Sequence, residues 1–223
     1  MLQSYTQLLT NNIDSIVFIL GAGTSLHGLD ISRIHSHPVI SVNSSILLMP
    51  WETGLEEDRY FISDDSAIRT WTYWKDVKQS KCHKIIRNSW EKYYDEIPDF
   101  YYFWPRKKPD TTIDPDDTGL CYYNSMATSI DFALKILGCK KIFLLGLDHY
   151  DVGGKTHFWQ FWPKEKQPKG MFAPILLQYK MFLGSEKTYD ALDKFAEYKD
   201  AKIFNCNPKS RVETFEKIDL KNV

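Results

Sequence analysis

Residues 121–150, CYYNSMATSIDFALKILGCKKIFLLGLDHY, constrain the fold more than any other part of this chain. Within them, apolar side chains recur at helical spacing over residues 125–137, and Gly138 follows in the position of a helix C-cap. Residues 141–147 then form a nearly continuous apolar run, which is typical of a strand buried on both faces. A helix that leads directly into such a strand predicts a parallel sheet covered by helices.

The rest of the chain also alternates short apolar runs with polar or helical segments. Further strands are expected over residues 15–20, 38–42, 59–63, 84–87, 100–104 and 201–205, and a second helix over residues 185–199. Residues 105–119 contain three prolines and are expected to form a loop. Residues 152–174 are too aromatic for a linker and too broken by glycine and proline for one regular element, which favours a lid or active-site flap.

Together these segments predict a single nucleotide-binding α/β domain over residues 1–223. We expect a Rossmann-like, mostly parallel sheet with helices on both faces, and an aromatic lid or flap formed by residues 152–184. A chain of 223 residues, 43% of them hydrophobic, is long enough to bury one substantial core.

Charge and cysteine content limit the partners and the compartment that we expect. A formal net charge of −1 supplies none of the positive field with which nucleic-acid-binding proteins neutralise phosphates, so we expect no nucleic-acid partner. The four cysteines form no CxxC pair, and the sequence does not start with a secretory leader, so we expect reduced thiols in the cytoplasm. No apolar stretch approaches the roughly 20 residues that span a bilayer, so no transmembrane segment is expected. Peripheral membrane contact and a homo-oligomer stay open.

The first expected strand runs directly into the loop Gly21-Ala22-Gly23-Thr24-Ser25. Glycines at this position let the backbone turn tightly while free amide groups face an anion or a sugar. A leucine stands where the dinucleotide-binding fingerprint has its third glycine, and no acidic residue ends the second strand. The loop therefore predicts a nucleotide site, and the alternative is a tight turn that binds nothing.

Polar side chains also follow the later strands, at the edge where open α/β sheets bind ligands. Asn43 ends the second strand, where its amide can donate to and accept from a base or ribose, and Asp64 ends the third. Asp148 can bind a metal, orient a ribose hydroxyl or cap the next turn, whereas the Tyr150 hydroxyl can donate to a phosphate oxygen. His157 in the flap is the candidate general base. The alternative for Tyr150 and His157 is a packing role.

On these residues, the chain resembles the bacterial sialyltransferases of glycosyltransferase family 42 and a broader set of domains that includes an archaeal hydroxymethylpterin diphosphokinase. In those families a first strand ends in a Gly-x-Gly-x-Ser-Leu loop, which residues 21–26 match, and the sialyltransferases have an asparagine after the second strand, as at Asn43. A later strand ends in Gly-hydrophobic-Asp-aromatic-Tyr, which residues 146–150 resemble. Residues 206–210 are similar to a Cys-Pro-Asn-Ser-like turn near the family's end.

The resemblance implies a role for each matching position. It implies that the glycine loop and Asn43 contact a cytidine nucleotide, that the region of Asn124 and Ser125 approaches the donor, and that no metal is needed. Tyr150 is then the residue that hydrogen-bonds the leaving phosphate. The family's second phosphate-binding tyrosine falls at Thr156, and its catalytic histidine has no counterpart in residues 188–223, which leaves His157. The nucleotide-binding prediction comprises Gly21, Ala22, Gly23, Thr24, Ser25, Asn43, Asp64, Asn124 and Ser125, and the catalytic prediction comprises Asp148, Tyr150 and His157.

Three functions follow as expectations. The first is a glycosyltransferase that takes a nucleotide sugar, with a CMP-sugar as the expected donor, and transfers the sugar to a glycan or small-molecule acceptor without a cofactor. The second is a diphosphokinase of the hydroxymethylpterin type, which would require Mg²⁺ held by carboxylates such as Asp64, Asp65 or Asp148. The third is a nucleotide-binding module without turnover.

Overall fold

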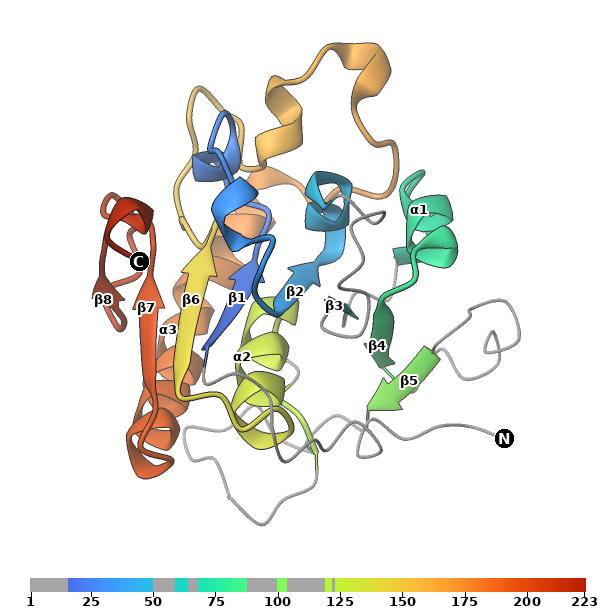
Figure 1. The fold of residues 1–223 in the computed structure, drawn as a ribbon. Coiled ribbons are helices and arrows are strands. Elements are labelled where there is room, and N and C mark those ends of the chain that lie inside the picture. The colour runs from blue at the N-terminus through green and yellow to red at the C-terminus, as the bar shows by residue number, and fades with distance from the viewer. Residues whose placement is uncertain (1–15, 50–58, 64–67, 88–99, 104–118, 122) are drawn as a thin grey trace.

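The structure is a computed structural model that describes residues 16–49, 59–63, 68–87, 100–103, 119–121 and 123–223. Within this part of the chain, eight parallel strands form one sheet in the order β5-β4-β3-β2-β1-β6-β7-β8 (Figure 1). The strands are β1 (Ile16–Leu20), β2 (Val39–Val42), β3 (Arg59–Ser63), β4 (His83–Arg87), β5 (Phe100–Phe103), β6 (Lys141–Leu145), β7 (Lys202–Asn205) and β8 (Glu216–Lys217). The predicted α/β architecture is confirmed.

The described helices are of two kinds. Three α-helices, α1 (Trp74–Gln79), α2 (Ser125–Lys135) and α3 (Ile175–Tyr198), connect or flank the strands. Short 3-10 helices fill the remaining connections: η2 (Thr24–Leu26), η3 (Ser32–Ile34), η4 (Asn43–Leu48), η6 (Ile68–Thr70), η8 (Phe158–Phe161), η9 (Lys164–Lys166) and η10 (Leu220–Asn222). None of the helices in the described part of the chain is both long and apolar enough to cross a membrane.

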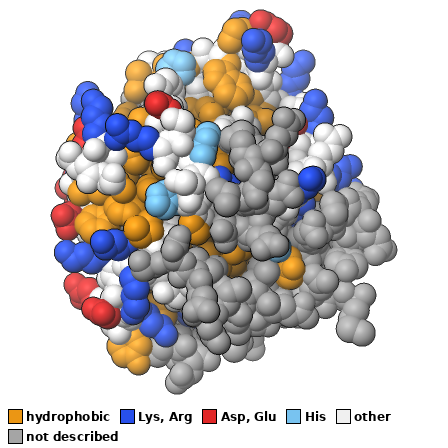
Figure 2. All heavy atoms as spheres, viewed as in Figure 1, with side chains coloured by type: hydrophobic (Ala, Val, Ile, Leu, Met, Phe, Trp, Pro, Cys, Tyr) orange, Lys and Arg blue, Asp and Glu red, His pale blue; other side chains and the backbone are white. Residues whose placement is uncertain are grey.

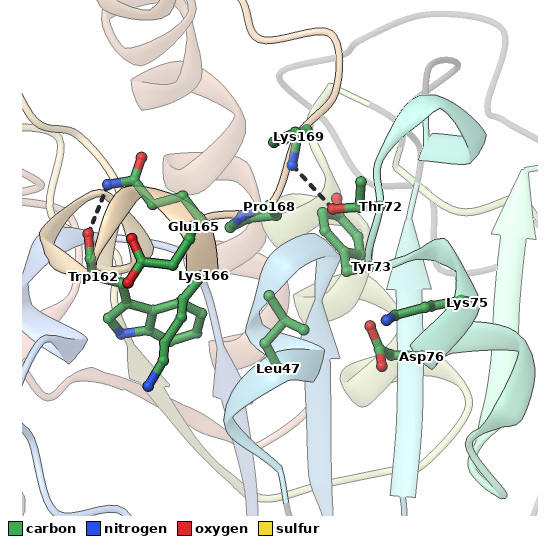
Figure 3. Close-up of a pocket in the computed structure, with 11 residues that line it drawn as sticks. Leu47, Thr72, Tyr73, Lys75, Asp76, Trp162, Glu165, Lys166, Pro168 and Lys169 are labelled. Atoms are coloured by element: carbon green, nitrogen blue, oxygen red, sulfur yellow. Dashed lines mark hydrogen bonds between the residues drawn. The ribbon is translucent and has the colours of Figure 1, made fainter.

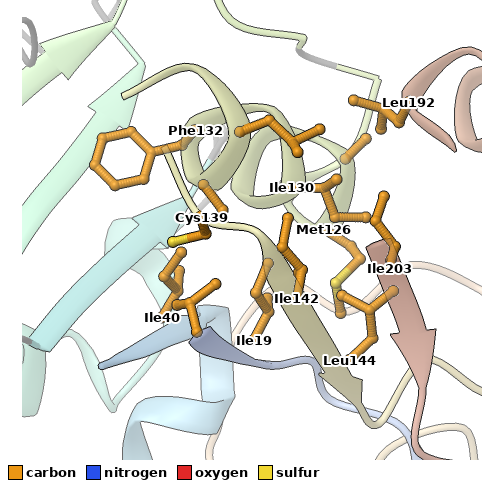
Figure 4. Close-up of a cluster of buried hydrophobic side chains, with 14 of the residues drawn as sticks. Ile19, Ile40, Met126, Ile130, Phe132, Cys139, Ile142, Leu144, Leu192 and Ile203 are labelled. Carbon is orange, nitrogen blue, oxygen red and sulfur yellow. The ribbon is translucent and has the colours of Figure 1, made fainter. Parts of the chain in front are cut away.

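The sheet is buried on both faces, which explains why its central strands are apolar without alternation. On one face, Ile19 of β1 and Ile142 of β6 pack against α2 side chains such as Ile130, with Leu192 of α3 at the edge of the same cluster (Figure 4). The opposite face is covered by α1 and the 3-10 helices, and Phe18 belongs to the core there. Successive residues of β1 therefore enter different cores.

The strand order places a topological switch point between β1 and β6. The chain builds the sheet outward from β1 to β5 and then returns to add β6 on the other side of β1. β1 and β6 pair from Ile16 opposite Lys141 to Leu20 opposite Leu145, so both strands end at the same level. In open α/β sheets, ligands bind outside the carboxyl ends of the strands at such a switch point.

The second long helix differs from the sequence prediction. We expected it over residues 185–199, but α3 begins ten residues earlier, directly after Pro174. Residues 175–184 are therefore helix and do not belong to an irregular flap. Gly184 lies within this helix, and a Cβ atom there would meet the ring hydroxyl of Tyr123, so the glycine is explained by close packing. Glycine has a low helix propensity, and tertiary packing overrides it at this position.

Smaller differences also concern the ends of elements. β6 ends at Leu145 instead of residue 147, because Gly146 has a φ of 72° and leaves the extended conformation. The two-residue strand β8 was not predicted, since two residues carry no periodic signal. The expected fifth strand is confirmed over Phe100–Phe103.

Residues 158–170, which we call the strap, cross the carboxyl edge of the sheet. At one end the amide of Phe158 donates to the carbonyl of Ala22 at 3.0 Å. At the other end Thr72 and Lys169 exchange two hydrogen bonds, of 2.7 Å from the Thr72 amide and 3.0 Å to the Thr72 hydroxyl. Figure 1 shows the strap at the top of the molecule, above the ends of the strands. The lid or flap that we expected over residues 152–184 stays a prediction.

Candidate functional site

The glycine loop packs directly against the end of β6. The Gly21 amide donates to the Leu145 carbonyl at 2.7 Å, and the Gly23 amide donates to the Gly146 carbonyl at 2.9 Å. A Cβ atom at Gly21 would lie 2.6 Å from the Gly146 oxygen, and one at Gly23 would lie 2.4 Å from the Asp148 carboxylate. Both glycines are therefore required by the close approach of two chain segments, and their amides are used within the protein.

Asp148 holds this loop in place through hydrogen bonds. Its side chain is buried, with the residue 3% exposed, and its carboxylate accepts four hydrogen bonds. Three come from the loop: the Ser25 amide at 2.7 Å, the Ser25 hydroxyl at 2.6 Å and the Thr24 hydroxyl at 3.2 Å. The fourth comes from the Asn207 amide group at 2.8 Å. Because a buried carboxylate requires such partners, the geometry favours the turn-capping interpretation of Asp148 over metal or ribose binding.

Two amides of the loop are left for a ligand. The amides of Ala22 and Thr24 make no hydrogen bond to any residue in the described ranges. They lie on either side of Gly23, at the carboxyl end of β1. The sequence predicts that the glycine loop offers backbone donors to a ligand. Because the amides of Gly21, Gly23 and Ser25 are bonded within the protein, the amides of Ala22 and Thr24 are the candidates for this role.

Asn43 occupies an unusual backbone conformation at the carboxyl end of β2. Its φ is 52°, in the left-handed region that asparagine tolerates better than most residues. Its side-chain nitrogen lies 3.4 Å from the Ser125 hydroxyl, as a long hydrogen bond. Its side-chain oxygen is shielded from solvent and has no hydrogen-bond partner among the residues that the structure describes. The turn is held by Ser45, whose hydroxyl accepts from the Val42 amide at 2.7 Å.

The amino end of α2 faces the same region. Asn124 is the N-cap: its side chain accepts from the Ala127 amide at 2.8 Å and donates to Ser185 at 3.0 Å. This predicted residue therefore stabilises α2 and ties it to α3, whereas Ser125 contacts Asn43. Met126 reaches the glycine loop, since a Cβ atom at Gly21 would lie 2.7 Å from its terminal methyl group. The positive end of the α2 dipole is thus directed toward the loop.

Tyr150 is joined to the site through a residue that sequence reasoning missed. The Asn207 side chain donates both to the Asp148 carboxylate and to the Tyr150 hydroxyl, the latter at 3.2 Å. The Tyr150 hydroxyl accepts in this bond, so its own proton can be donated to a ligand. The Ser210 hydroxyl donates to the Leu147 carbonyl at 2.7 Å and holds the same turn. The signal for both was the similarity of residues 206–210 to a family turn.

His157 directly precedes the strap, and the next residue, Phe158, is hydrogen-bonded to Ala22 of the glycine loop. Its Nδ1 atom is 2.9 Å from the Thr156 hydroxyl, and its ring meets Phe172 at 4.9 Å and Trp159 at 5.6 Å between centroids. Burial lowers the pKa of His157 to about 4, because the charged form loses its hydration. The imidazole is therefore neutral at pH 7.

A second histidine is in a similar state. His149 follows Asp148 with a φ of 56° and stacks on Phe182 of α3 at 4.6 Å. Burial lowers the pKa of His149 to about 4 as well. In the neighbouring turn, the Tyr179 hydroxyl of α3 donates to the Asp151 carboxylate. These contacts fix the chain that leaves β6 against α3.

Of the three acidic residues proposed for a metal, the structure describes Asp148. Asp64 and Asp65 lie outside the described residues, and the Asp148 carboxylate is occupied by the four donors above. Within the described ranges, no three His, Cys, Asp or Glu side chains are grouped so as to hold a metal ion.

A pocket of about 400 Å³ opens between the strap and the connection from β3 to α1 (Figure 3). Leu47 of η4, Tyr73 and Trp162 form apolar parts of its wall. Its charged lining consists of Lys75, Asp76, Glu165, Lys166 and Lys169. None of the predicted site residues in the described ranges lines this pocket.

On the face shown in Figure 2, lysine and arginine side chains are scattered among acidic and apolar ones. The described surface on this face offers no continuous basic track for a polyphosphate backbone. A small nucleotide at the strand ends is compatible with such a surface.

Several of the predicted residues that the structure describes thus lie together: the glycine loop, Asn43, Ser125, the end of β6 and the start of the strap meet at the β1–β6 switch point. Comparison of the chain with family models, with curated proteins and with solved structures finds no match.

Proposed function

We propose that this chain binds a nucleotide sugar at the β1–β6 switch point, with a CMP-sugar as the first candidate, and transfers the sugar to a glycan or small-molecule acceptor. The observation that carries the proposal is Asn43 at the carboxyl end of β2, whose buried side-chain oxygen has no partner within the described part of the chain. The resemblance to the sialyltransferases supports the same position for the nucleotide.

An acceptor atom buried without a donor costs about 1–3 kcal/mol, so a ligand that supplies the donor gains that amount in binding. The amino group of cytosine and a ribose hydroxyl are both suitable donors to Asn43. The phosphate then finds the positive end of α2 and the two unused amides, of Ala22 and Thr24. Neutral donors bind a phosphate without a metal ion.

The transfer step uses groups beside this nucleotide position. An acceptor hydroxyl attacks the anomeric carbon, the bond from that carbon to the phosphate oxygen breaks, and the nucleoside monophosphate leaves with the bonding electrons. Tyr150 donates a hydrogen bond to the leaving phosphate, and neutral His157 takes the proton of the acceptor hydroxyl. The pKa of about 4 keeps His157 able to accept a proton throughout the neutral range.

A nucleotide-binding module without turnover is the second candidate function. The same low pKa makes His157 a weak base, and its Nδ1 atom is already within hydrogen-bonding distance of Thr156. Thr156 also stands where the sialyltransferases have their second phosphate-binding tyrosine. The diphosphokinase alternative receives less support, because the Asp148 carboxylate is filled by protein donors.

A thermal-shift screen separates these functions. The ligands are CMP, CDP, UDP, GDP and ATP, each with and without Mg²⁺, and CMP alone is expected to stabilise the protein. A requirement for ATP with Mg²⁺ would favour the diphosphokinase. Release of CMP from a CMP-sugar in the presence of acceptors then distinguishes a transferase from a binding module. Absence of stabilisation by all five nucleotides would refute the nucleotide site.

A further inference from the structure

A large apolar surface lies beside the strap, and its member Phe172 also contacts His157. Eleven large hydrophobic side chains are exposed in the described part of the chain, and seven of them fall within residues 171–183. We call these seven the apolar ridge: Met171, Phe172, Ile175, Leu176, Leu177, Met181 and Leu183. Soluble surfaces carry single exposed hydrophobic residues, whereas a contiguous patch marks a contact surface.

The ridge is built into the first turns of α3. The sequence from Ile175 to Gly184, ILLQYKMFLG, is apolar around most of the helix, and a helix of this kind is normally covered on all sides. Gln178 and Ser185 face the protein and are buried. Leu176 and Leu183 are 74% and 80% exposed, and their spacing of seven residues places them on one side of the helix, pointing away from the core.

The charges around the ridge are mainly positive. Lys180 stands four residues after Leu176 and three before Leu183, so it lies on the same side of α3, and Lys187 continues that side. The strap adds further exposed lysines. Residues 163–187 contain five lysines and two glutamates: Lys164, Lys166, Lys169, Lys180 and Lys187 with Glu165 and Glu186.

We propose that the apolar ridge docks on an anionic lipid bilayer, with the leucines in the interfacial layer and the lysines at the phosphate level. Amphipathic segments of this composition bind membranes in the interface plane, and lysine stems extend along apolar surface while their ammonium groups stay at the charged level. A second copy of the chain would cover the leucines, but a two-fold contact along this side would bring Lys180 against like charges. An anionic bilayer offers an apolar layer to the leucines and phosphate groups to the lysines.

This docking does not depend on the proposed nucleotide function. The test is co-sedimentation of the full chain with vesicles of phosphatidylcholine alone and with vesicles containing 30% phosphatidylglycerol. We expect at least tenfold stronger binding to the anionic vesicles, and weaker binding as salt is raised. The double variant Leu176→Ser/Leu183→Ser should lose at least tenfold in binding to them. The matched control, Leu29→Ser/Val223→Ser, removes two exposed apolar side chains elsewhere and should bind as the unaltered chain does.

A charge variant and a measurement of size complete the test. Lys180→Glu/Lys187→Glu should weaken binding to anionic vesicles severalfold while leaving the melting temperature unchanged. Sedimentation velocity of the unaltered chain without vesicles shows whether the ridge joins two copies. A dimer that the leucine variant dissociates, together with no binding to anionic vesicles, would overturn the proposal, as would equal vesicle binding by the leucine variant and the unaltered chain.

Discussion

At the residue scale, Gly23 is fixed by the close approach of two strand ends. A Cβ atom at this position would lie 2.4 Å from the Asp148 carboxylate and 2.6 Å from the Gly146 backbone oxygen, so neighbouring atoms must move. We expect Gly23→Ala to lower the free energy of unfolding by about 2 kcal/mol. Urea denaturation measures this. Gly28→Ala is the control, because nothing surrounds that glycine and only its φ of 74° is strained. If the two variants lower the free energy of unfolding equally, the close packing around Gly23 does not explain why a glycine is needed there.

Asp148 is the second residue whose substitution should lower the free energy of unfolding substantially. Asp148→Asn keeps the shape of the side chain but turns one acceptor into a donor that faces the Ser25 and Asn207 donors. We expect a loss of about 3 kcal/mol in the free energy of unfolding, since hydrogen bonds to a charged group are lost and buried donors stay unpaired. Asp30→Asn is the control, because that exposed carboxylate is hydrogen-bonded locally, to Ser32. If Asp148→Asn lowers the free energy of unfolding by less than Asp30→Asn does, Asp148 does not hold the loop in place.

The sequence located most of these residues but not their partners. Gly21, Gly23 and Asp148 each follow a recognisable strand, so their positions at the sheet edge could be predicted. The contacts of Asp148 with Ser25 and Asn207 span 123 and 59 residues of sequence, and no local pattern encodes such pairings. The sequence also could not predict that the Asn43 side-chain oxygen lacks a partner among the described residues, because this depends on how η4 packs.

At the element scale, the segments that carry His149 and His157 should make the fold sensitive to acid. Both histidines have a folded pKa of about 4, against 6.5 for an unperturbed imidazole. The unfolded chain therefore binds more protons between these values, and the free energy of unfolding falls as the pH is lowered from 6.5 to 4. Each residue contributes up to about 3 kcal/mol over this window.

Thermal melts from pH 7 to pH 4 check this dependence. Carboxylates also titrate at the lower end, so the informative comparison is with His157→Gln, whose melting temperature should fall less steeply over the same range. The unaltered chain is the reference and should show the steeper slope. Parallel curves for the two proteins would show that His157 is not buried in its neutral form.

The attachment of the strap to the β3–α1 connection can be tested in the same way. Thr72→Val removes the hydrogen bond from the Lys169 amide to the Thr72 hydroxyl but keeps the backbone bond between the two residues. A loss of about 1 kcal/mol raises the open population of the strap about fivefold. Trypsin cleavage after Lys164, Lys166 or Lys169 should accelerate by that factor. Thr214→Val, which removes a distant exposed hydroxyl, should leave the rate unchanged.

The ends of strands and helices were predictable where the apolar pattern in the sequence has clear limits. The predictions were wrong where tertiary packing determines where an element begins or ends. β3 was placed at its observed bounds because its apolar run ends sharply at polar residues. The start of α3 was missed, because residues 175–184 were assigned to the flap, whereas the helix begins at Ile175 and continues through Gly184, which packs against Tyr123.

At the scale of the whole molecule, the sequence predicted a parallel sheet but not its strand order. The alternation of strands and helices is local, whereas the return from β5 to the far side of β1 is a long-range event. That return creates the switch point, and with it the single edge at which the glycine loop, Asn43 and the end of β6 meet. The site is therefore a property of the topology and of no one motif.

Because the ligand would bind the folded state alone, nucleotide binding should raise the stability of the entire chain. At a CMP concentration of 100 times Kd the gain is about 2.7 kcal/mol, which corresponds to a rise in Tm of roughly 5–10 °C for a chain of this length. Asn43→Gly keeps the left-handed backbone but removes the unpartnered oxygen, so it should weaken CMP binding about tenfold and halve the rise in Tm. Asp200→Gly is the matched control, since Asp200 has a similar φ of 54° and lies in the turn after α3. EDTA should leave the rise unchanged. If Asn43→Gly and Asp200→Gly respond to CMP alike, Asn43 does not contact the nucleotide, and the observation that carries the proposed function is lost.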